Sequence, residues 1–340
     1  MKHWITGTVA VAALLTGCGG HDSPSASTES HYRGPGSVWD VTLNTPAPNT
    51  FNIKKYSAPN GTLLLDVDGN YTVKPSNLLE MTATTVNTGS GVSPGDVGIG
   101  LEAPDYALFM DFGGQLIPMV HLGTCPTVLT RWNTLPVTQG TGSPTPRLRQ
   151  VSYDPSAGTI SIAAYDTTSP FSYLSGSSYN ASCANGVITF TNGSGESIEG
   201  YLSPSGAFVA RNLNNGGIFY GVRLPAAPIP ALAPNDLDGT YTGMQFDGIN
   251  APSYIKMTCA SNSCTGSKID VDDNATSPAQ GFTLIADPTL PNARYVRTTV
   301  GSDSAICTVD LNVNGKHLLD CVEIAVTPPG SYKNFVLYQR

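Results

Sequence analysis

Charged side chains are scarce in this chain of 340 residues, and basic ones are the scarcer kind. Lys and Arg number 17 against 25 Asp and Glu, the formal net charge is −8 at pH 7, and only 12% of the residues are charged. Proteins that bind nucleic acid need basic patches that neutralise phosphates. The composition therefore argues against a nucleic acid partner, although it identifies no other partner.

Helical periodicity and long apolar runs are also missing. No window of about a dozen residues keeps apolar residues at positions i, i+3, i+4 and i+7, so we expect almost no helix. The apolar run at 5–15 is too short to cross a bilayer, which needs about 20 apolar residues. Its length is typical of the apolar part of a secretory signal peptide.

The run ends in Leu15-Thr16-Gly17-Cys18. With the basic Lys2 in front, the first eighteen residues resemble a bacterial lipoprotein signal peptide, whose lipobox consists of a Leu, two small residues and a Cys. The resemblance implies that 1–17 are removed and that lipid is attached to the sulfur of Cys18. The alternative is an ordinary secretory signal that happens to precede a Cys.

The same resemblance implies a location in the bacterial cell envelope. Two or three acyl chains anchor a protein stably in a membrane, whereas a single chain does not. In lipoproteins of bacteria with two membranes, an Asp after the lipidated Cys retains the protein in the inner membrane. Gly19 occupies that position here, which favours the outer membrane and leaves its periplasmic or surface face open.

Composition divides the mature chain into four parts. Residues 18–36 are mostly polar and are interpreted as the lipidated Cys and a flexible tether. Residues 37–223 are expected to form a first β-rich domain, and 236–340 a second, barrel-like domain. Between them, 224–235 holds four prolines, which favour an extended linker.

Both domains are predicted to be all-β and antiparallel, because short apolar or alternating runs are separated by turn residues. In the first domain the predicted strands are 38–43, 62–67, 81–86, 97–102, 106–112, 116–122, 128–132, 148–153, 159–165, 187–191, 197–202, 207–212 and 217–223. In the second they are 239–246, 253–258, 265–271, 281–286, 294–300, 305–312, 316–324 and 332–339. The second set suits an eight-stranded meander closed into a barrel, with a sandwich of two sheets as the alternative.

Six of the seven cysteines remain once Cys18 is set aside, and an even number in an exported chain predicts disulfides. The domain boundary separates two of them from the other four. Of those four, two bracket a four-residue hairpin loop, and two become direct partners if 313–315 form a three-residue loop. We predict the bonds Cys125–Cys183, Cys259–Cys264 and Cys307–Cys321. Metal binding by these thiols is disfavoured because Cys-x-x-Cys spacing and nearby His are lacking.

Two patterns resemble catalytic motifs but lack an essential part. The stretch 91–95 matches G-x-S-x-G, yet Pro94 has no N–H for an oxyanion hole and no helical pattern follows. We interpret it as a loop. Glu196 and Glu199 are three residues apart on a predicted strand and should face opposite sides, so they cannot flank one glycosidic bond. No catalytic residue is predicted.

Metal-binding patterns are equally incomplete. The acidic stretches 66–70 and 270–274 lack the Gly and Glu that an EF-hand loop requires, and we interpret them as turns, with an irregular calcium site as the alternative. His31 is expected in the tether, whereas His121 and His317 fall in different domains. The sequence therefore predicts no metal site and no cofactor.

Three classes of function remain. The exclusions favour a lipid-anchored envelope protein that acts by binding or scaffolding and is not an enzyme. The first alternative is a carrier that encloses a small apolar ligand in the barrel of 236–340. The second is an envelope hydrolase whose site forms only in three dimensions. An apolar cavity in that barrel would favour the carrier, and the partner, small molecule or envelope protein, stays open.

Overall fold

The computed structural model contains only β-structure in the parts of the chain that it describes. None of the described residues forms an α-helix, so none belongs to a helix that could cross a membrane. The antiparallel all-β fold expected from the sequence is confirmed. The described residues are 28–35, 38–45, 48–112, 115–137, 147–167, 171–193, 195–203, 206–214, 216–246, 251–287, 289–300, 303–324 and 332–340.

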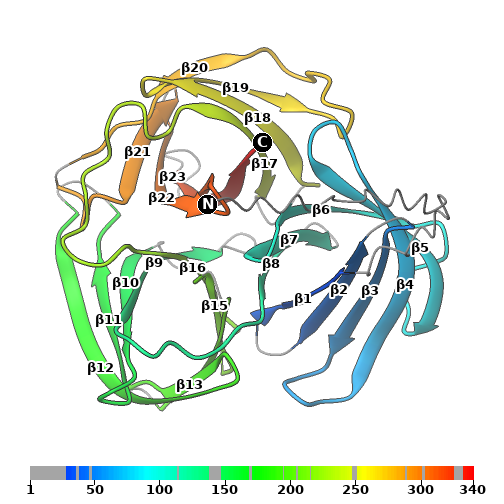
Figure 1. Ribbon diagram of the computed structural model, residues 1–340, viewed down its shortest axis with the longest axis horizontal. Coiled ribbons are helices and arrows are strands. Elements are labelled where there is room, and N and C mark those ends of the chain that lie inside the picture. Colours follow the sequence, from blue (N-terminus) through cyan, green and yellow to red (C-terminus); the bar gives the residue numbers. More distant parts are fainter. Residues whose placement is uncertain are drawn as a thin grey trace, which may run out of the picture.

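The first sheet is a closed eight-stranded barrel in which each strand pairs with the next (Figure 1). It closes where Tyr32 on its first strand pairs with His121 on its last. The strands are β1 (Thr28–Arg33), β2 (Trp39–Thr45), β3 (Thr50–Tyr56), β4 (Leu63–Val73), β5 (Leu78–Thr88), β6 (Val97–Ala103), β7 (Ala107–Phe112) and β8 (Gln115–His121).

The second sheet is also a closed eight-stranded barrel, and it closes where Leu135 on its first strand pairs with Tyr220 on its last. The strands are β9 (Thr130–Val137), β10 (Leu148–Asp154), β11 (Thr159–Tyr165), β12 (Tyr173–Ala184), β13 (Val187–Thr191), β14 (Ser197–Leu202), β15 (Phe208–Asn212) and β16 (Ile218–Arg223).

The third sheet repeats this order and forms the meander barrel predicted for 236–340. Its first and last strands pair, and the remaining gap is joined by one bridge, in which Ile285 and Arg297 exchange backbone hydrogen bonds of 2.8 and 2.9 Å. The strands are β17 (Gly239–Phe246), β18 (Ser253–Ala260), β19 (Ser263–Ile269), β20 (Gln280–Thr283), β21 (Tyr295–Val300), β22 (Asp303–Val313), β23 (Lys316–Ile324) and β24 (Tyr332–Gln339). The proline-rich segment 224–235 contains no strand.

The assignment of 28–33 to the tether was wrong, because these residues form β1. Half of its six residues are exposed and only one is fully buried, so the strand is polar and shows no apolar alternation. Tyr32 is its fully buried residue, and its hydroxyl donates a 2.5 Å hydrogen bond to Glu102. Without β1 the first barrel would have open edges at β2 and β8.

The region 37–223 holds two barrels where one β-rich domain was expected. β8 pairs with β7 and β1, whereas β9 pairs with β10 and β16, so no ladder joins the two sheets. The connecting segment 122–129 has one proline and therefore lacks the composition that marked 224–235. The sequence also missed β3 and β12; the first half of β12 is exposed, and only its second half alternates partly buried with exposed residues.

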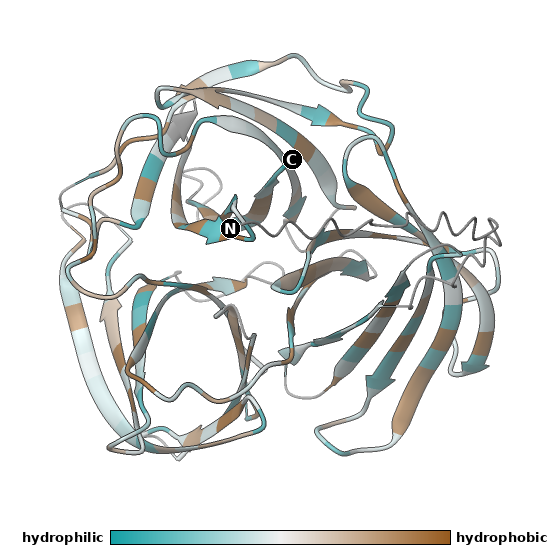
Figure 2. Ribbon diagram, viewed as in Figure 1, coloured by the Kyte–Doolittle hydropathy of each residue, from teal (hydrophilic) through white to brown (hydrophobic). Residues whose placement is uncertain are grey.

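The three barrels share one hydrophobic core where their outer faces meet. Figure 1 shows the three rings of strands around a common centre, and in Figure 2 hydrophobic and hydrophilic bands alternate along many strands. This alternation gives each strand an inner face that fills its own barrel and an outer face that can pack on another. The shared core includes Leu101 and Phe109 of the first barrel, Tyr220 of the second, and Met244 and Val336 of the third.

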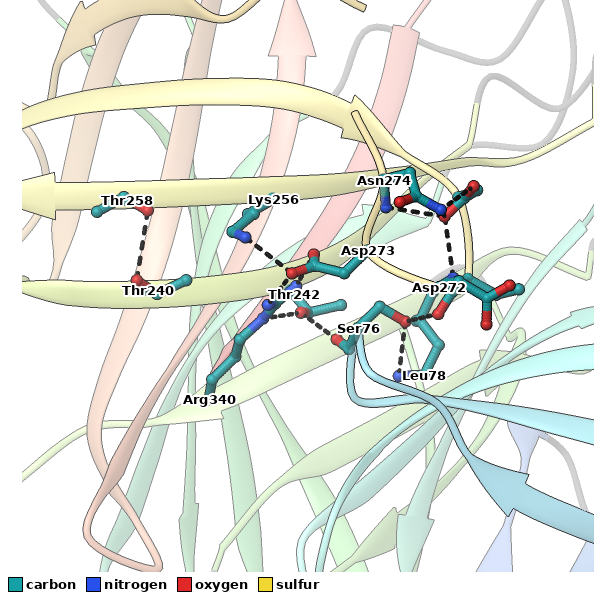
Figure 3. A network of polar contacts seen from close by, with 12 residues as sticks. Ser76, Leu78, Thr240, Thr242, Lys256, Thr258, Asp272, Asp273, Asn274 and Arg340 are labelled. Atoms are coloured by element: carbon teal, nitrogen blue, oxygen red, sulfur yellow. Dashed lines mark hydrogen bonds and ion pairs between the residues drawn. The ribbon is translucent and has the colours of Figure 1, made fainter. Parts of the chain in front are cut away.

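A polar network joins the first barrel to the third (Figure 3). The Ser76 hydroxyl donates to the carbonyl of Val271 at 2.7 Å, and the Thr242 hydroxyl donates to the carbonyl of Ser76. Arg340 donates to the Thr242 hydroxyl at 2.7 Å and binds both carboxylate oxygens of Asp273 at 2.8 and 2.6 Å. The interface is therefore fixed by directional contacts as well as by apolar packing.

Candidate ligand-binding cavity

A cavity of about 990 Å³ lies within the third barrel. Residues of all eight strands of that barrel contribute to its lining. Its volume falls in the range of about 300–1,000 Å³ typical of small-molecule sites. Small eight-stranded barrels have room for one small ligand when inward side chains leave space.

The inner wall of the cavity is largely apolar. Alternate residues of a strand face the same side of a sheet, and this periodicity brings inward-facing apolar side chains from neighbouring strands together. Ile255 and Met257 contribute from β18, Leu319 from β23, and Phe335 and Leu337 from β24. The wall can therefore hold an apolar body by burial alone, at about 25 cal/mol per Å² of apolar surface removed from water.

Small inward residues create the space. Gly266 on β19 and Ala305 on β22 line the cavity and leave room that larger side chains would fill. A Cβ atom placed on Gly266 would lie 3.2 Å from the ring edge of Phe282, another lining residue. A larger side chain at Gly266 would therefore press against this ring, and both positions contribute to the free volume of the barrel.

One end of the barrel is closed by packed side chains. Leu237, Tyr241 and Val309 are buried there. The Tyr241 hydroxyl donates to the carbonyl of Leu237 at 2.9 Å and lies 3.0 Å from Nδ1 of His317. Burial lowers the pKa of His317 and raises that of Tyr241, which favours the neutral form of both rings. This end is therefore a packed floor.

Polar residues gather at the opposite end of the cavity. Gln245 is near the end of β17, Ser253 begins β18, and Glu323 and Lys333 pair across β23 and β24. The Lys333 ammonium lies 2.9 Å from the Glu323 carboxylate, and Gln245 donates to the same carboxylate at 3.3 Å. The Glu323 side chain is 13% exposed and that of Lys333 36%, so their charges lie at the rim.

Lys268 also lines this end, from β19. Lys268 is exposed, and its ammonium forms no ion pair or side-chain hydrogen bond with any residue that the structure describes. The described lining thus carries two cations and one anion, and the anion is already paired. Among the described lining residues, one positive charge, that of Lys268, therefore has no partner.

The structure contains the three disulfides at the predicted positions, with Cα–Cα distances of 5.9, 4.1 and 4.0 Å for Cys125–Cys183, Cys259–Cys264 and Cys307–Cys321. The bonds of the third barrel lie in its core, and Cys307 lines the cavity. The lipidation site Cys18 lies outside the described residues.

The turn beside Cys307–Cys321 differs from the predicted three-residue loop. Asn314 and Gly315, both with positive φ, form a two-residue turn that pairs Val313 with Lys316. A register shift between Asp310 and Val313 then brings Cys307 opposite Cys321. An extra residue in one strand, as in a β-bulge, thus produces the pairing that the longer loop was expected to produce.

The motif-like stretches do not converge on the cavity. Ser93 lies in the exposed loop between β5 and β6, where its N–H donates to Asp96 at 2.7 Å. Glu196 accepts hydrogen bonds from Asn192 and Asn212 at 2.7 and 3.0 Å, and Glu199 accepts one from Tyr201. These contacts are those of turns and strand faces.

The acidic stretches and the His residues are also apart from the cavity. Residues 66–70 lie within β4, and Asp270 caps its own turn by accepting from the N–H groups of Asp272 and Asn274 at 2.9 Å each. His121 packs edge-on against Tyr32, and its pKa is lowered by burial. Over the described ranges, no three His, Cys, Asp or Glu side chains gather as a metal site would require.

Buried carboxyl groups lie between the barrels rather than in the cavity. Asp310 accepts a 2.9 Å hydrogen bond from Tyr106 of the first barrel, and burial raises its pKa. Asp320 is 4% exposed, and burial raises its pKa well above the usual value. Its Oδ2 and the buried Tyr220 hydroxyl have no hydrogen-bond partner among the described residues. These groups belong to the shared interface.

The sequence did not identify the cavity residues. The inward set is visible as alternate positions along the predicted strands, and Gly266 and Ala305 break its run of larger side chains. Which small residues face each other depends on the strand register, and the sequence does not fix that register. The informative signal was small residues at inward positions, here on β19 and β22.

Comparison with known proteins identifies no family. No family model matches the chain, and no curated protein matches it. Transferrin-binding protein B, isotype 1, from serogroup B Neisseria meningitidis is a structural match at 9% identity over 89% of this chain and 65% of that chain, with a TM-score of 0.26. This chain therefore spans only 65% of the length of that protein.

A second solved structure, the β chain of DNA polymerase III from Streptococcus pneumoniae, matches at 8% identity over 92% of this chain and 91% of that one, with a TM-score of 0.12. Both TM-scores are too low for either similarity to bear on fold or function.

Proposed function

We propose that this chain is a lipid-anchored binding protein of the bacterial cell envelope, and that its third barrel holds a small molecule with an apolar body. The observation that carries the proposal is the 990 Å³ cavity with its apolar wall and polar mouth. Ligand sites combine this kind of wall with a few polar groups that orient the ligand. Among the functions considered, the carrier gains the most support from this geometry.

The geometry favours binding over hydrolysis. A hydrolase of the Ser–His type needs a base within hydrogen-bond reach of its nucleophile. Of the His residues in the folded part that the structure describes, His121 packs on a tyrosine ring and His317 contacts a tyrosine hydroxyl at the floor of the barrel. His31 lies 3.2 Å from the Thr42 hydroxyl and contacts Glu29, but its side chain is 55% exposed on β1 and does not line the cavity. The charged groups at the cavity are one paired carboxylate and two ammonium groups, which suit recognition of a ligand.

Binding can be tested with N-phenyl-1-naphthylamine, a neutral probe that fluoresces in apolar surroundings. The mature protein should bind it saturably with one site. Gly266→Trp places an indole at an inward position beside Phe282 and should abolish that signal. Thr265→Trp changes the adjacent, exposed residue and should leave it intact. If neither variant alters the signal while both remain folded, the probe does not occupy this cavity.

The anchor is a separate part of the proposal and rests on Leu15-Thr16-Gly17-Cys18. Cys18→Ala should release the protein from membranes or block processing of its signal peptide, because no other residue in the lipobox can carry the thioether. Fractionation of cells that express each form would detect this change. A variant that remained in the outer membrane fraction like the parent would contradict lipid attachment at Cys18.

A further inference from the structure

We infer that the ligand of the third barrel is a single-chain amphiphile with an anionic head group, held by Lys268 at the mouth. This inference rests on the proposed function, since it requires that the cavity binds a ligand at all. It adds the chemical class and orientation of that ligand. Three observations lead to it: the polarity gradient of the cavity, the pairing of Glu323 and the uncommitted charge of Lys268.

The polarity gradient fixes how an amphiphile must enter. The floor at Leu237 and Tyr241 is packed, and the wall above it is formed by residues such as Met257 and Leu319. A charged group placed there would lose its hydration without gaining a partner, which is costly. The apolar end of a ligand therefore lies toward the floor, and its polar end lies at the mouth.

The charges at the mouth decide the sign of the head group. Glu323 already has Lys333 at 2.9 Å and Gln245 at 3.3 Å. A cationic head group would have to compete with Lys333 for this carboxylate. An anionic one would find Lys268, whose ammonium has no side-chain partner among the described residues. Charge-assisted hydrogen bonds between an ammonium and a carboxylate are about twice as strong as neutral ones.

Two kinds of anionic head group, a carboxylate and a phosphate, fit these contacts. A fatty acid presents a carboxylate and a single-chain phospholipid presents a phosphate, and both accept hydrogen bonds from an ammonium. Lys binds either group as a compact point charge and so does not select between them by geometry. The shared chemistry is an anion at the end of one alkyl chain, and the test includes both.

The test is displacement of N-phenyl-1-naphthylamine from the mature protein by amphiphiles with the same twelve-carbon chain (about the length of a detergent tail, chosen so that apolar burial is constant). They are dodecanoate, dodecyl phosphate, dodecanol and dodecyltrimethylammonium, the three ionic ones used below their micelle concentrations and dodecanol below its solubility limit. We expect either or both anions to displace the probe at concentrations about tenfold or more below those of the alcohol and the cation, as expected for one charge-assisted hydrogen bond.

Variants assign the preference to Lys268. Lys268→Ala should remove the advantage of the anions over dodecanol, and Lys268→Glu should shift the preference to the cation. Lys54→Glu makes the same charge change on β3 of the first barrel and should leave the order unchanged. Probe binding and unfolding curves of each variant show that the cavity and fold are retained.

The outcomes separate the two proposals. If the probe binds and all four amphiphiles displace it equally, or the cation displaces it best, the inference about the head group is wrong and the cavity proposal stands. The inference is also wrong if the anions bind best and Lys268→Ala does not change this. If neither the probe nor any amphiphile binds, the proposed function itself fails.

Discussion

Replacing Asp273 with Asn tests whether the interface network of Figure 3 stabilises the third barrel. The carboxylate of Asp273 receives two hydrogen bonds from Arg340, at 2.8 and 2.6 Å, and one from Lys256 at 2.8 Å. The side chains of Asp273 and Arg340 are 21% and 19% exposed, so their interaction is only partly screened by water. Lys256 is 35% exposed and should add little.

From these contacts we expect Asp273→Asn to lower the free energy of unfolding by about 2 kcal/mol at pH 7, within the range for hydrogen bonds to charged groups. Urea unfolding followed by circular dichroism measures this loss. Asp272→Asn is the matched control, because the adjacent Asp272 is 57% exposed and lies 3.2 Å from Lys74 across solvent-accessible surface. Its effect should be much smaller.

The pH dependence has a definite sign. Hydrogen bonds from Arg340 are the largest cause that holds the pKa of Asp273 well below its ordinary value. A carboxyl group with a lowered pKa in the folded state stabilises the protein above its unfolded pKa of about 4, and this contribution is lost as the pH falls through the folded pKa. The difference between parent and Asp273→Asn should therefore be constant above about pH 5 and shrink below about pH 4.

Two results would refute this reasoning. Equal losses for Asp273→Asn and Asp272→Asn would show that burial and geometry do not distinguish the two carboxylates. A difference between parent and Asp273→Asn that grew as the pH fell would show that the sign assigned to the pKa is wrong. In either case the network would be a consequence of the interface rather than a source of its stability.

Two further predictions concern the disulfides and a buried carboxyl group. Replacing Cys125 and Cys183 together should lower the free energy of unfolding by about 4 kcal/mol, because their bond closes a loop with a sequence separation of 58. Loss of Cys259–Cys264, with a separation of only 5, should lower it by about 2 kcal/mol or less. Urea unfolding of the two variants compares these losses. The Asp320→Asn variant should have a higher free energy of unfolding than the parent at pH 9. The difference between the two proteins should be smaller at pH 5. Burial raises the pKa of Asp320, so the parent loses stability as the pH rises and the carboxyl ionises, whereas Asn stays neutral. A parent that is at least as stable as the variant at pH 9 would contradict this prediction.

The sequence predicted the strands of the third barrel well and the number of barrels poorly. The predicted strands 239–246, 316–324 and 332–339 coincide with β17, β23 and β24, because apolar alternation and turn residues mark both ends of each. β12 was missed because its first six residues are exposed and only Tyr179, Ala181 and Cys183 of its second half pack against the core. Three partly buried residues, one of them a small Ala, leave only a weak periodic signal in the sequence.

The cavity is formed by residues of several strands, and which of them face it depends on how these strands pair. The pairing of Cys259 with Cys264 sets the register of β19 against β18. With this register, Gly266 is at an inward position. Lys268 then follows on the same face, two residues along the strand, and becomes part of the mouth. The hairpin was predicted from its two cysteines, whereas the opposite wall, with Leu319 and Phe335, comes from strands more than fifty residues later.

The most direct measurement is a crystal structure of the mature protein grown with dodecanoate. We expect one alkyl chain inside the third barrel, against Met257, Phe282 and Leu319, with its carboxylate within hydrogen-bond distance of Lys268. An empty third barrel, or a chain bound only elsewhere on the molecule, would contradict this expectation.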